Sequence, residues 1–120
     1  WEQPMAMVRF ERTARACDLV VDQFKLGAFG GIVFKTLALG TPVLTFLDEN
    51  NLREQYAETP PVINCACRED VVKELSQIIA DPSKLERLGD ASRAWMAKYH
   101  GKRDTINVEV DQFRRLATAP

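Results

Sequence analysis

The sequence has almost no net charge. Its 120 residues include 16 lysines and arginines against 17 aspartates and glutamates, which gives a formal net charge of −1. Without an excess of positive charge the chain has no field to attract a polyanion, so we expect neither nucleic acid nor an acidic membrane surface as a partner. No apolar run reaches about 18 residues, so we also expect no membrane-spanning helix. No charged-then-apolar leader is visible, which favours a cytoplasmic protein.

Cysteine and histidine are scarce. The three cysteines are an odd number, and Cys65 and Cys67 stand too close in the chain for a usual disulfide or a zinc knuckle. We therefore expect Cys17, Cys65 and Cys67 to be buried or partly buried thiols in a reducing cytoplasm, and we expect no metal. His100 is the only histidine. We expect it to pack or to contact carbonyl groups at a helix end rather than to act as a catalyst.

Short apolar runs alternate with helical patterns in the first half of the chain. Helical spacing of Met5, Val8, Ala14 and Ala16 after Pro4 predicts a first helix. Apolar runs over 19–21, 42–47 and 62–65 predict strands, the first of them covered on both faces. A loop over 23–29, a helix over 30–39 closed by Gly40 and a short helix over 51–57 lie between them. This order predicts right-handed crossovers and a parallel sheet.

The rest of the chain is helical in pattern. An apolar stripe predicts a helix over 68–80, and Asp81-Pro82 predicts the cap and first residue of another that ends near residue 100 and buries Trp95 and Tyr99. Asp104 is expected to cap a last helix, whose apolar side comprises Ile106, Val110, Phe113 and Ala117. We therefore predict one α/β domain over 1–120. It is a three-layer Rossmann-like half domain, with about three parallel strands flanked by helices and a helical C-terminal third.

The carboxyl ends of the strands are the expected ligand-binding edge, because ligands bind there in open α/β sheets. The residues that follow the strands are Asp22, Gln23, Lys25, Asp48, Glu49 and Asn64. Gly27, Gly30 and Gly31 bring bare amides to the start of a helix, where the dipole favours a phosphate or a diphosphate. The same glycines also suit a turn that lets a helix pack closely on a strand, and their spacing alone does not separate the two readings.

Several stretches together resemble a known family. They are Cys17-Asp18-Leu19-Val20-Val21-Asp22-Gln23, Gly27-Ala28-Phe29-Gly30, Leu37-Ala38-Leu39-Gly40-Thr41-Pro42-Val43 and Pro60-Pro61-Val62-Ile63-Asn64, with the Asp81-Pro82 helix start, residues 89–93 and Tyr99-His100. The combination is similar to the C-terminal domain of group-1 glycosyltransferases of the GT-B fold, in which a G-x-F-G-like loop precedes an E-A-x-A-x-G-x-P-V helix and strand. The resemblance covers nearly the whole chain.

The resemblance implies a nucleotide-sugar site. In such enzymes the amides of the glycine loop hold the donor diphosphate, and the corresponding residues here are Gly27, Ala28, Phe29, Gly30, Gly31 and Ile32. Lys35 is either a partner for a phosphate or a solvated lysine of the helix. The family also has two glutamates at this loop, one near the donor sugar and one accepting from the ribose hydroxyls. Gly27 and Lys35 occupy those places, and neither can supply a carboxylate. We therefore expect no catalytic residue and no independent catalysis.

The resemblance is to the later part of a two-domain enzyme, so we expect a separate N-terminal domain or partner chain to complete it. Three parallel strands leave an open edge beside residues 19–21. We expect two copies to pair there or through the adjoining helices, as an isologous dimer. Apart from a possible nucleotide-diphosphate sugar as ligand, no cofactor is expected. The alternative is a degenerate stand-alone protein that keeps the fold for dimerisation or protein binding.

Overall fold

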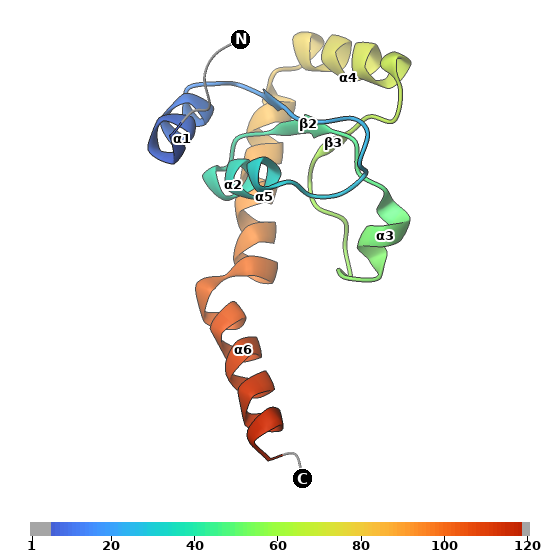
Figure 1. Cartoon of the computed structure of the whole chain (residues 1–120). Helices are drawn as coiled ribbons and strands as arrows, with labels where there is room; N and C mark the ends of the chain where they lie inside the picture. The colour runs from blue at the N-terminus through green and yellow to red at the C-terminus, as the bar shows by residue number, and fades with distance from the viewer. Residues whose placement is uncertain (1–5, 119–120) are drawn as a thin grey trace.

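The computed structural model describes residues 6–118, apart from the side chain of Asp104. Helices and strands follow one another along the chain as drawn in Figure 1. They are α1 (Met7–Arg15), β1 (Val20–Val21), α2 (Gly31–Leu39), β2 (Val43–Thr45), α3 (Glu49–Arg53), β3 (Ile63–Asn64), α4 (Arg68–Ala80), α5 (Ser83–His100) and α6 (Lys102–Ala117). The α/β class is confirmed. Pro4 and Met5, on which part of the first helix was predicted, lie outside the described residues.

The three strands form one parallel sheet in the order β1-β2-β3. In the register Val20 pairs with Val43, Val21 and Ile63 pair with Leu44, and Thr45 pairs with Asn64. The predicted parallel arrangement is confirmed. Because each strand is added on the same side of the one before it, the order does not reverse anywhere in the part of the chain that the structure describes.

Helices cover both faces of the sheet (Figure 1). On one face Val43 packs with residues of α2 and α5, in a cluster of Val33, Leu37, Val43 and Trp95. On the other face Leu44 packs with α4, in a cluster of Leu44, Ile63, Cys65 and Ile78. Neighbouring residues of a strand point to opposite faces, so Val43 and Leu44 divide the core into two halves.

Two glycines let α2 and α5 touch. Gly40 ends α2 with a φ of 75°, the left-handed conformation expected of a helix-ending glycine, and its amide donates to the carbonyl of Leu37 at 3.0 Å. A Cβ on Gly89 of α5 would collide with the carbonyl oxygen of Gly40. The Arg93 side chain covers Gly40 from α5. Only a glycine at 89 leaves room for this crossing.

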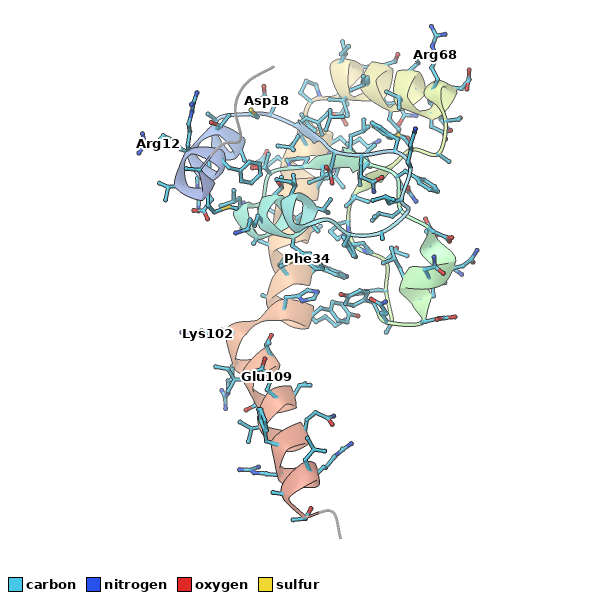
Figure 2. All side chains as sticks on the ribbon, viewed as in Figure 1. Arg12, Asp18, Phe34, Arg68, Lys102 and Glu109 are labelled. Atoms are coloured by element: carbon cyan, nitrogen blue, oxygen red, sulfur yellow. The ribbon has the colours of Figure 1, made fainter. Side chains whose placement is uncertain are left out.

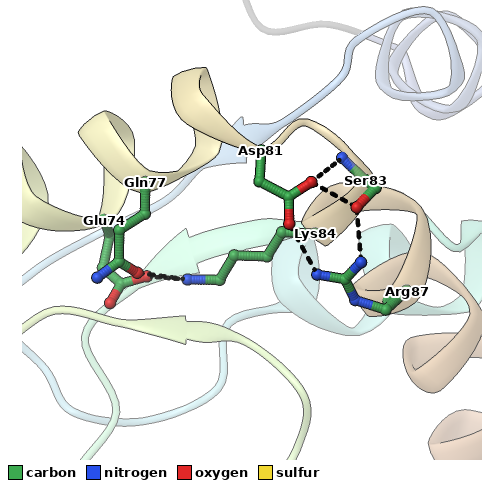
Figure 3. Close-up of polar contacts among 6 residues, drawn as sticks. All are labelled: Glu74, Gln77, Asp81, Ser83, Lys84 and Arg87. Atoms are coloured by element: carbon green, nitrogen blue, oxygen red, sulfur yellow. Dashed lines mark hydrogen bonds and ion pairs between the residues drawn. The ribbon is translucent and has the colours of Figure 1, made fainter.

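A polar cluster fixes the corner between α4 and α5 (Figure 3). The carboxylate of Asp81 accepts from the Ser83 amide at 3.2 Å and pairs with the Arg87 guanidinium at 3.2 Å. From α5, Lys84 reaches back to Gln77 at 3.1 Å and pairs with Glu74. The Asp81 carboxylate thus accepts from the first amide of α5, but the predicted cap is wrong by one residue, because the N-cap is Pro82 and the first helical residue is Ser83.

Some predicted element boundaries are wrong. The short helix is α3, Glu49–Arg53, and not 51–57, because the Asp48 carboxylate accepts from the Asn50 amide at 3.0 Å and caps an earlier start. The last helix begins at Lys102, directly after Gly101, so Asp104 lies within α6 and does not precede it.

Two burial predictions are also wrong. The first strand is not covered on both faces, because β1 is an edge strand and Val21 is 59% exposed. Of the three free thiols only Cys65 is buried, because it packs in the core cluster of Leu44, Ile63 and Ile78, whereas Cys17 and Cys67 lie in exposed connections.

The last helix extends away from the rest of the molecule. Figure 1 shows α6 continuing beyond the end of α5, and Figure 2 shows its side chains, Glu109 among them, standing out from the helix. The molecule measures 59 × 32 × 28 Å. Its radius of gyration is 16.7 Å, against about 13.6 Å for a compact domain of this length. No helix within residues 6–118 is long and apolar enough to cross a membrane.

Candidate functional site

The glycine loop follows β1 at the carboxyl edge of the sheet. Gly27 is buried with a φ of 62°. A Cβ there would lie 3.1 Å from Asp48 Cβ and 3.2 Å from a ring carbon of Phe46. Its carbonyl accepts from the Asp48 amide at 2.8 Å. Gly27 therefore ties the loop to the segment after β2, and its role is structural.

Gln23 holds the loop in shape. Its side-chain oxygen accepts from the amides of Lys25 and Leu26, both at 2.7 Å, and its side-chain nitrogen donates to the Ala28 carbonyl at 3.2 Å. The amides of Lys25 and Leu26 are thus already used and are not free for a phosphate. The sequence placed Gln23 at this edge but gave no sign of this role, beyond a polar side chain at the start of a short loop.

The start of α2 is open. The helix begins at Gly31, Gly30 precedes it in an extended conformation, and no side chain caps the end. The first amides of a helix have no acceptor within the helix. A Cβ on Gly31 would meet nothing within 4 Å, and Ile32 is exposed as well. Of the predicted loop residues, Gly30, Gly31 and Ile32 therefore have the arrangement that a bound phosphate requires.

The remaining predicted site residues, Phe29, Ala28 and Lys35, differ in how deeply their side chains are buried. Phe29 anchors the loop in the core, with its ring centre 4.8 Å from that of Phe34 and 6.0 Å from that of Trp95. Ala28 is exposed. Lys35 is partly buried in α2, one turn after Gly31 and on the same side of the helix. Side chains in a helix tilt toward its N-terminus, so a lysine at this position leans toward the turn that contains Gly31.

Asp22 stands beside this open end. Its Oδ2 atom is buried, has no hydrogen-bond partner among the described residues, and lies 3.6 Å from where a Cβ on Gly30 would be. A buried carboxylate oxygen without a donor is costly, so a donor group of a ligand would be stabilising here. The same negative charge opposes a phosphate placed close to it.

The other residues at this edge serve the local fold. Asp48 caps α3, as described above. The Asn64 side chain exchanges two hydrogen bonds with the backbone of Leu47, each at 2.9 Å, and its nitrogen lies 3.5 Å from Glu49. Lys25 is exposed. No three His, Cys, Asp or Glu side chains within the described residues are placed to hold a metal ion.

Two hollows lie at opposite ends of the sheet. The one beside the glycine loop has a volume of 250 Å³ and is lined by Gly27, Ala28, Phe29, Phe34, Asn51, Leu52 and Gln55. Pockets for ligands of nucleotide size are on the order of 300–1,000 Å³, so this hollow holds only part of such a ligand. A larger hollow of 840 Å³ lies at the amino ends of the strands, with Arg15, Asp18, Pro42, Ile79 and Arg93 in its lining. The sequence gave no indication of it.

A cluster of rings lies behind the glycine loop. Trp95 is only 4% exposed, and its ring centre lies 4.9 Å from those of Tyr56 and Tyr99. The Tyr56 hydroxyl and His100 Nε2 are 3.0 Å apart. Burial lowers the pKa of His100 and raises the pKa of Tyr56. Trp95 and Tyr99 belong to the core, and His100 packs within it, as predicted.

Comparisons of the chain with protein-family models, with curated proteins and with solved structures found no match. The first strand, the glycine loop and the following helix of the chain form a parallel α/β unit with an uncapped helix start at the carboxyl edge of the sheet.

Proposed function

We propose that the chain is the nucleotide-sugar-binding part of a glycosyltransferase-like protein, with the donor diphosphate at the amides of Gly30, Gly31 and Ile32. The observation that carries this proposal is the uncapped start of α2 at the carboxyl end of β1, where Gly31 leaves open space. Lys35 supplies the positive charge to the phosphates. The resemblance to the donor-binding domain of GT-B enzymes supports the same assignment.

The chain does not catalyse the transfer by itself. Gly27 and Lys35 stand where the family has its glutamates, so no catalytic residue is assigned. A separate N-terminal domain or partner chain supplies the acceptor site. A reducing cytoplasm suits its three free cysteines.

Titration with UDP, GDP, ADP and their sugars, followed by calorimetry, tests the proposal. We expect binding in the high micromolar range that Gly31→Glu weakens at least tenfold, about 1.4 kcal/mol, by charge repulsion at the phosphate site. Gly31→Gln is the matched control, since it adds nearly the same volume without the charge. The proposal is contradicted if no binding is detected at millimolar ligand, or if Gly31→Glu and Gly31→Gln weaken binding equally.

Asp22 gives the titration a second readout. Asp22→Asn removes the negative charge, so we expect tighter binding of the free nucleoside diphosphate. If Asp22 instead accepts from a hydroxyl of the donor sugar, the same substitution weakens the nucleotide sugar relative to the free diphosphate.

A second candidate is a scaffold that has lost nucleotide binding and serves dimerisation or protein binding. It is favoured by exposed apolar side chains on β1, α4 and α6, among them Val21, Ile79 and Phe113. If calorimetry detects no binding of any nucleotide, and the chain associates with itself or with a partner protein, this second function is supported.

A further inference from the structure

Apolar side chains form a stripe along α6 that no described part of the chain buries. Ile106, Val110, Phe113 and Ala117 are all exposed, Phe113 by 72%. They follow one another after four, three and four residues. This alternation is that of the a and d positions of a heptad repeat, which meet the same positions of another helix in a coiled coil. In α6, Val110 and Ala117 stand at a, and Ile106 and Phe113 stand at d.

The stripe does not face α5, the neighbouring element that touches α6. Thr105, Val108 and Glu109 border a hollow together with Tyr99 and His100, so this side of α6 faces the end of α5. Successive residues of a helix are about 100° apart, so the middle of the stripe lies about 110° around α6 from Thr105. A second helix can therefore bind along the stripe without moving α6 from α5 (Figure 1).

Opposite charges flank the stripe. Glu109 stands at the g position, beside Val110, and Arg114 stands at the e position, beside Phe113. Arg114 pairs with Asp111 of its own helix at 3.4 Å, but 77% of its side chain is exposed. A guanidinium has five N–H donors, so Arg114 can bind a second carboxylate from outside the helix.

These flanks complement each other in a parallel pair of α6 helices. There a g residue of one helix faces the e residue five positions further along its partner, and charges at e and g set partner choice and direction. Glu109 of each copy therefore faces Arg114 of the other. In an antiparallel pair with the stripes fully overlapped, Glu109 faces the apolar Leu116 instead. The charges thus indicate both what covers the stripe and in which direction it runs.

We propose that α6 pairs with α6 of a second copy of this chain as a parallel two-stranded coiled coil, with two Glu109–Arg114 ion pairs between the copies. The two-fold axis runs along the pair, so the contact is isologous and closes at two copies. Val110 suits two strands, because a β-branched residue at an a position favours the dimer. The proposal does not depend on nucleotide binding and can hold if that function fails.

The pairing is weak, because the 16 residues of α6 supply only about two heptads. A helix of this length is marginally stable in water without packing, so pairing also stabilises α6 itself. We therefore expect a dissociation constant in the high micromolar range, and an uncovered α6 in dilute solution.

Sedimentation equilibrium of the full chain, from low micromolar to millimolar concentration at low salt, tests the proposal. We expect the mass to rise from that of one chain toward that of two. Glu109→Lys and Arg114→Glu should each raise the dissociation constant about tenfold, because each turns two attractive pairs into two repulsive ones. An equimolar mixture of the two variants should regain the wild-type mass, because each variant then faces the opposite charge on the other. A folding defect in either variant cannot produce this rescue.

Phe113→Asp and Val108→Asp separate the stripe from the rest of α6. The two side chains are 72% and 62% exposed on the same helix, so the substitutions are matched in their cost to an isolated helix. Phe113→Asp should keep the chain monomeric over the whole concentration range, because it places a charge in the stripe. Val108→Asp should dimerise like the wild type, because Val108 lies on the opposite side of α6. Circular dichroism of both variants should show unchanged helix content in dilute solution.

A wild-type chain that stays monomeric at millimolar concentration overturns the proposal. A mixture of Glu109→Lys and Arg114→Glu that is no heavier than the separate variants overturns it too, as does a dimer that survives Phe113→Asp. Hydrogen–deuterium exchange gives a further readout, since amide exchange in α6 should slow as the chain concentration rises. Exchange in α6 that does not change with concentration contradicts the proposal.

Discussion

Single side chains, or their absence, decide how closely the elements of this molecule approach. Gly89 has a packing role, since α5 passes the carbonyl of Gly40 where no Cβ fits. Gly31 has no such neighbour and Gly27 has a left-handed backbone. Three glycines thus serve three purposes, of which composition alone reveals none. A lone glycine inside a helical pattern is the one sequence signal of close packing, and Gly89 carries it.

Gly89→Ala should destabilise the protein by about 1–3 kcal/mol, because the added methyl group forces α2 and α5 apart. Gly31→Ala is the control and should change the free energy of unfolding by less than about 1 kcal/mol, because its methyl group meets open space. Urea unfolding followed by circular dichroism measures both. Equal effects of the two substitutions would show that the α2–α5 crossing tolerates a side chain.

His100 should make stability depend on pH. Burial lowers its pKa below the ordinary value of about 6.5, so the unfolded chain takes up a proton more readily than the folded one. The stabilisation that neutral His100 gives the folded state is therefore complete above pH 6.5. It is lost as the pH falls from there toward the lowered pKa. We expect His100→Gln to flatten the pH dependence of the unfolding free energy in this range. The same slope in both proteins would contradict this account.

At the scale of elements, the order of strands and helices was predictable and their limits were less so. Apolar runs separated by helical patterns indicate a parallel sheet wherever they occur, because the connections are long enough for crossover helices. Capping depends on which side chain reaches which amide. The capping of α3 by Asp48 and the start of α6 directly after Gly101 were therefore missed. The aspartate before Pro82 predicted where α5 starts to within one residue, but the N-cap is Pro82 and not Asp81.

The glycine loop, too, was predictable only in part. The sequence predicted that bare amides would stand at the start of a helix, and Gly30, Gly31 and Ile32 do. It did not predict that Gln23 would use the amides of Lys25 and Leu26, because that contact depends on how the loop folds back on itself. The part of the site nearest the helix is local in sequence, whereas the part shaped by the loop is not.

α6 should be the least protected helix of the chain. It contacts little beyond the end of α5, and Ile106, Val110 and Phe113 are exposed along its 16 residues. Helices of this length without tertiary packing are only marginally stable in water. In hydrogen–deuterium exchange of the full chain, amides of α6 should exchange well before those of α5. Equal protection of both helices would mean that another surface covers α6.

At the scale of the whole molecule, the sheet is built outward in one direction from β1. The apolar run over 19–21 suggested a strand covered on both faces, yet Val21 is exposed, because a sequence pattern records how apolar a strand is and not what lies beside it. The extended α6 explains why the molecule is less compact than its length allows. The exposure of Val21 and the position of α6 are properties of the assembled chain that no single segment reveals.

The ring cluster also gives the protein an intrinsic optical reporter. The chain has two tryptophans, and replacing Trp1 by phenylalanine leaves Trp95 as the sole indole fluorophore. Around it lie rings from three separate segments, with Phe29 of the glycine loop at 6.0 Å and Tyr56 at 4.9 Å. Fluorescence of Trp95 therefore senses the position of the glycine loop. A ligand that moves that loop changes the emission, so binding can be followed without an attached dye.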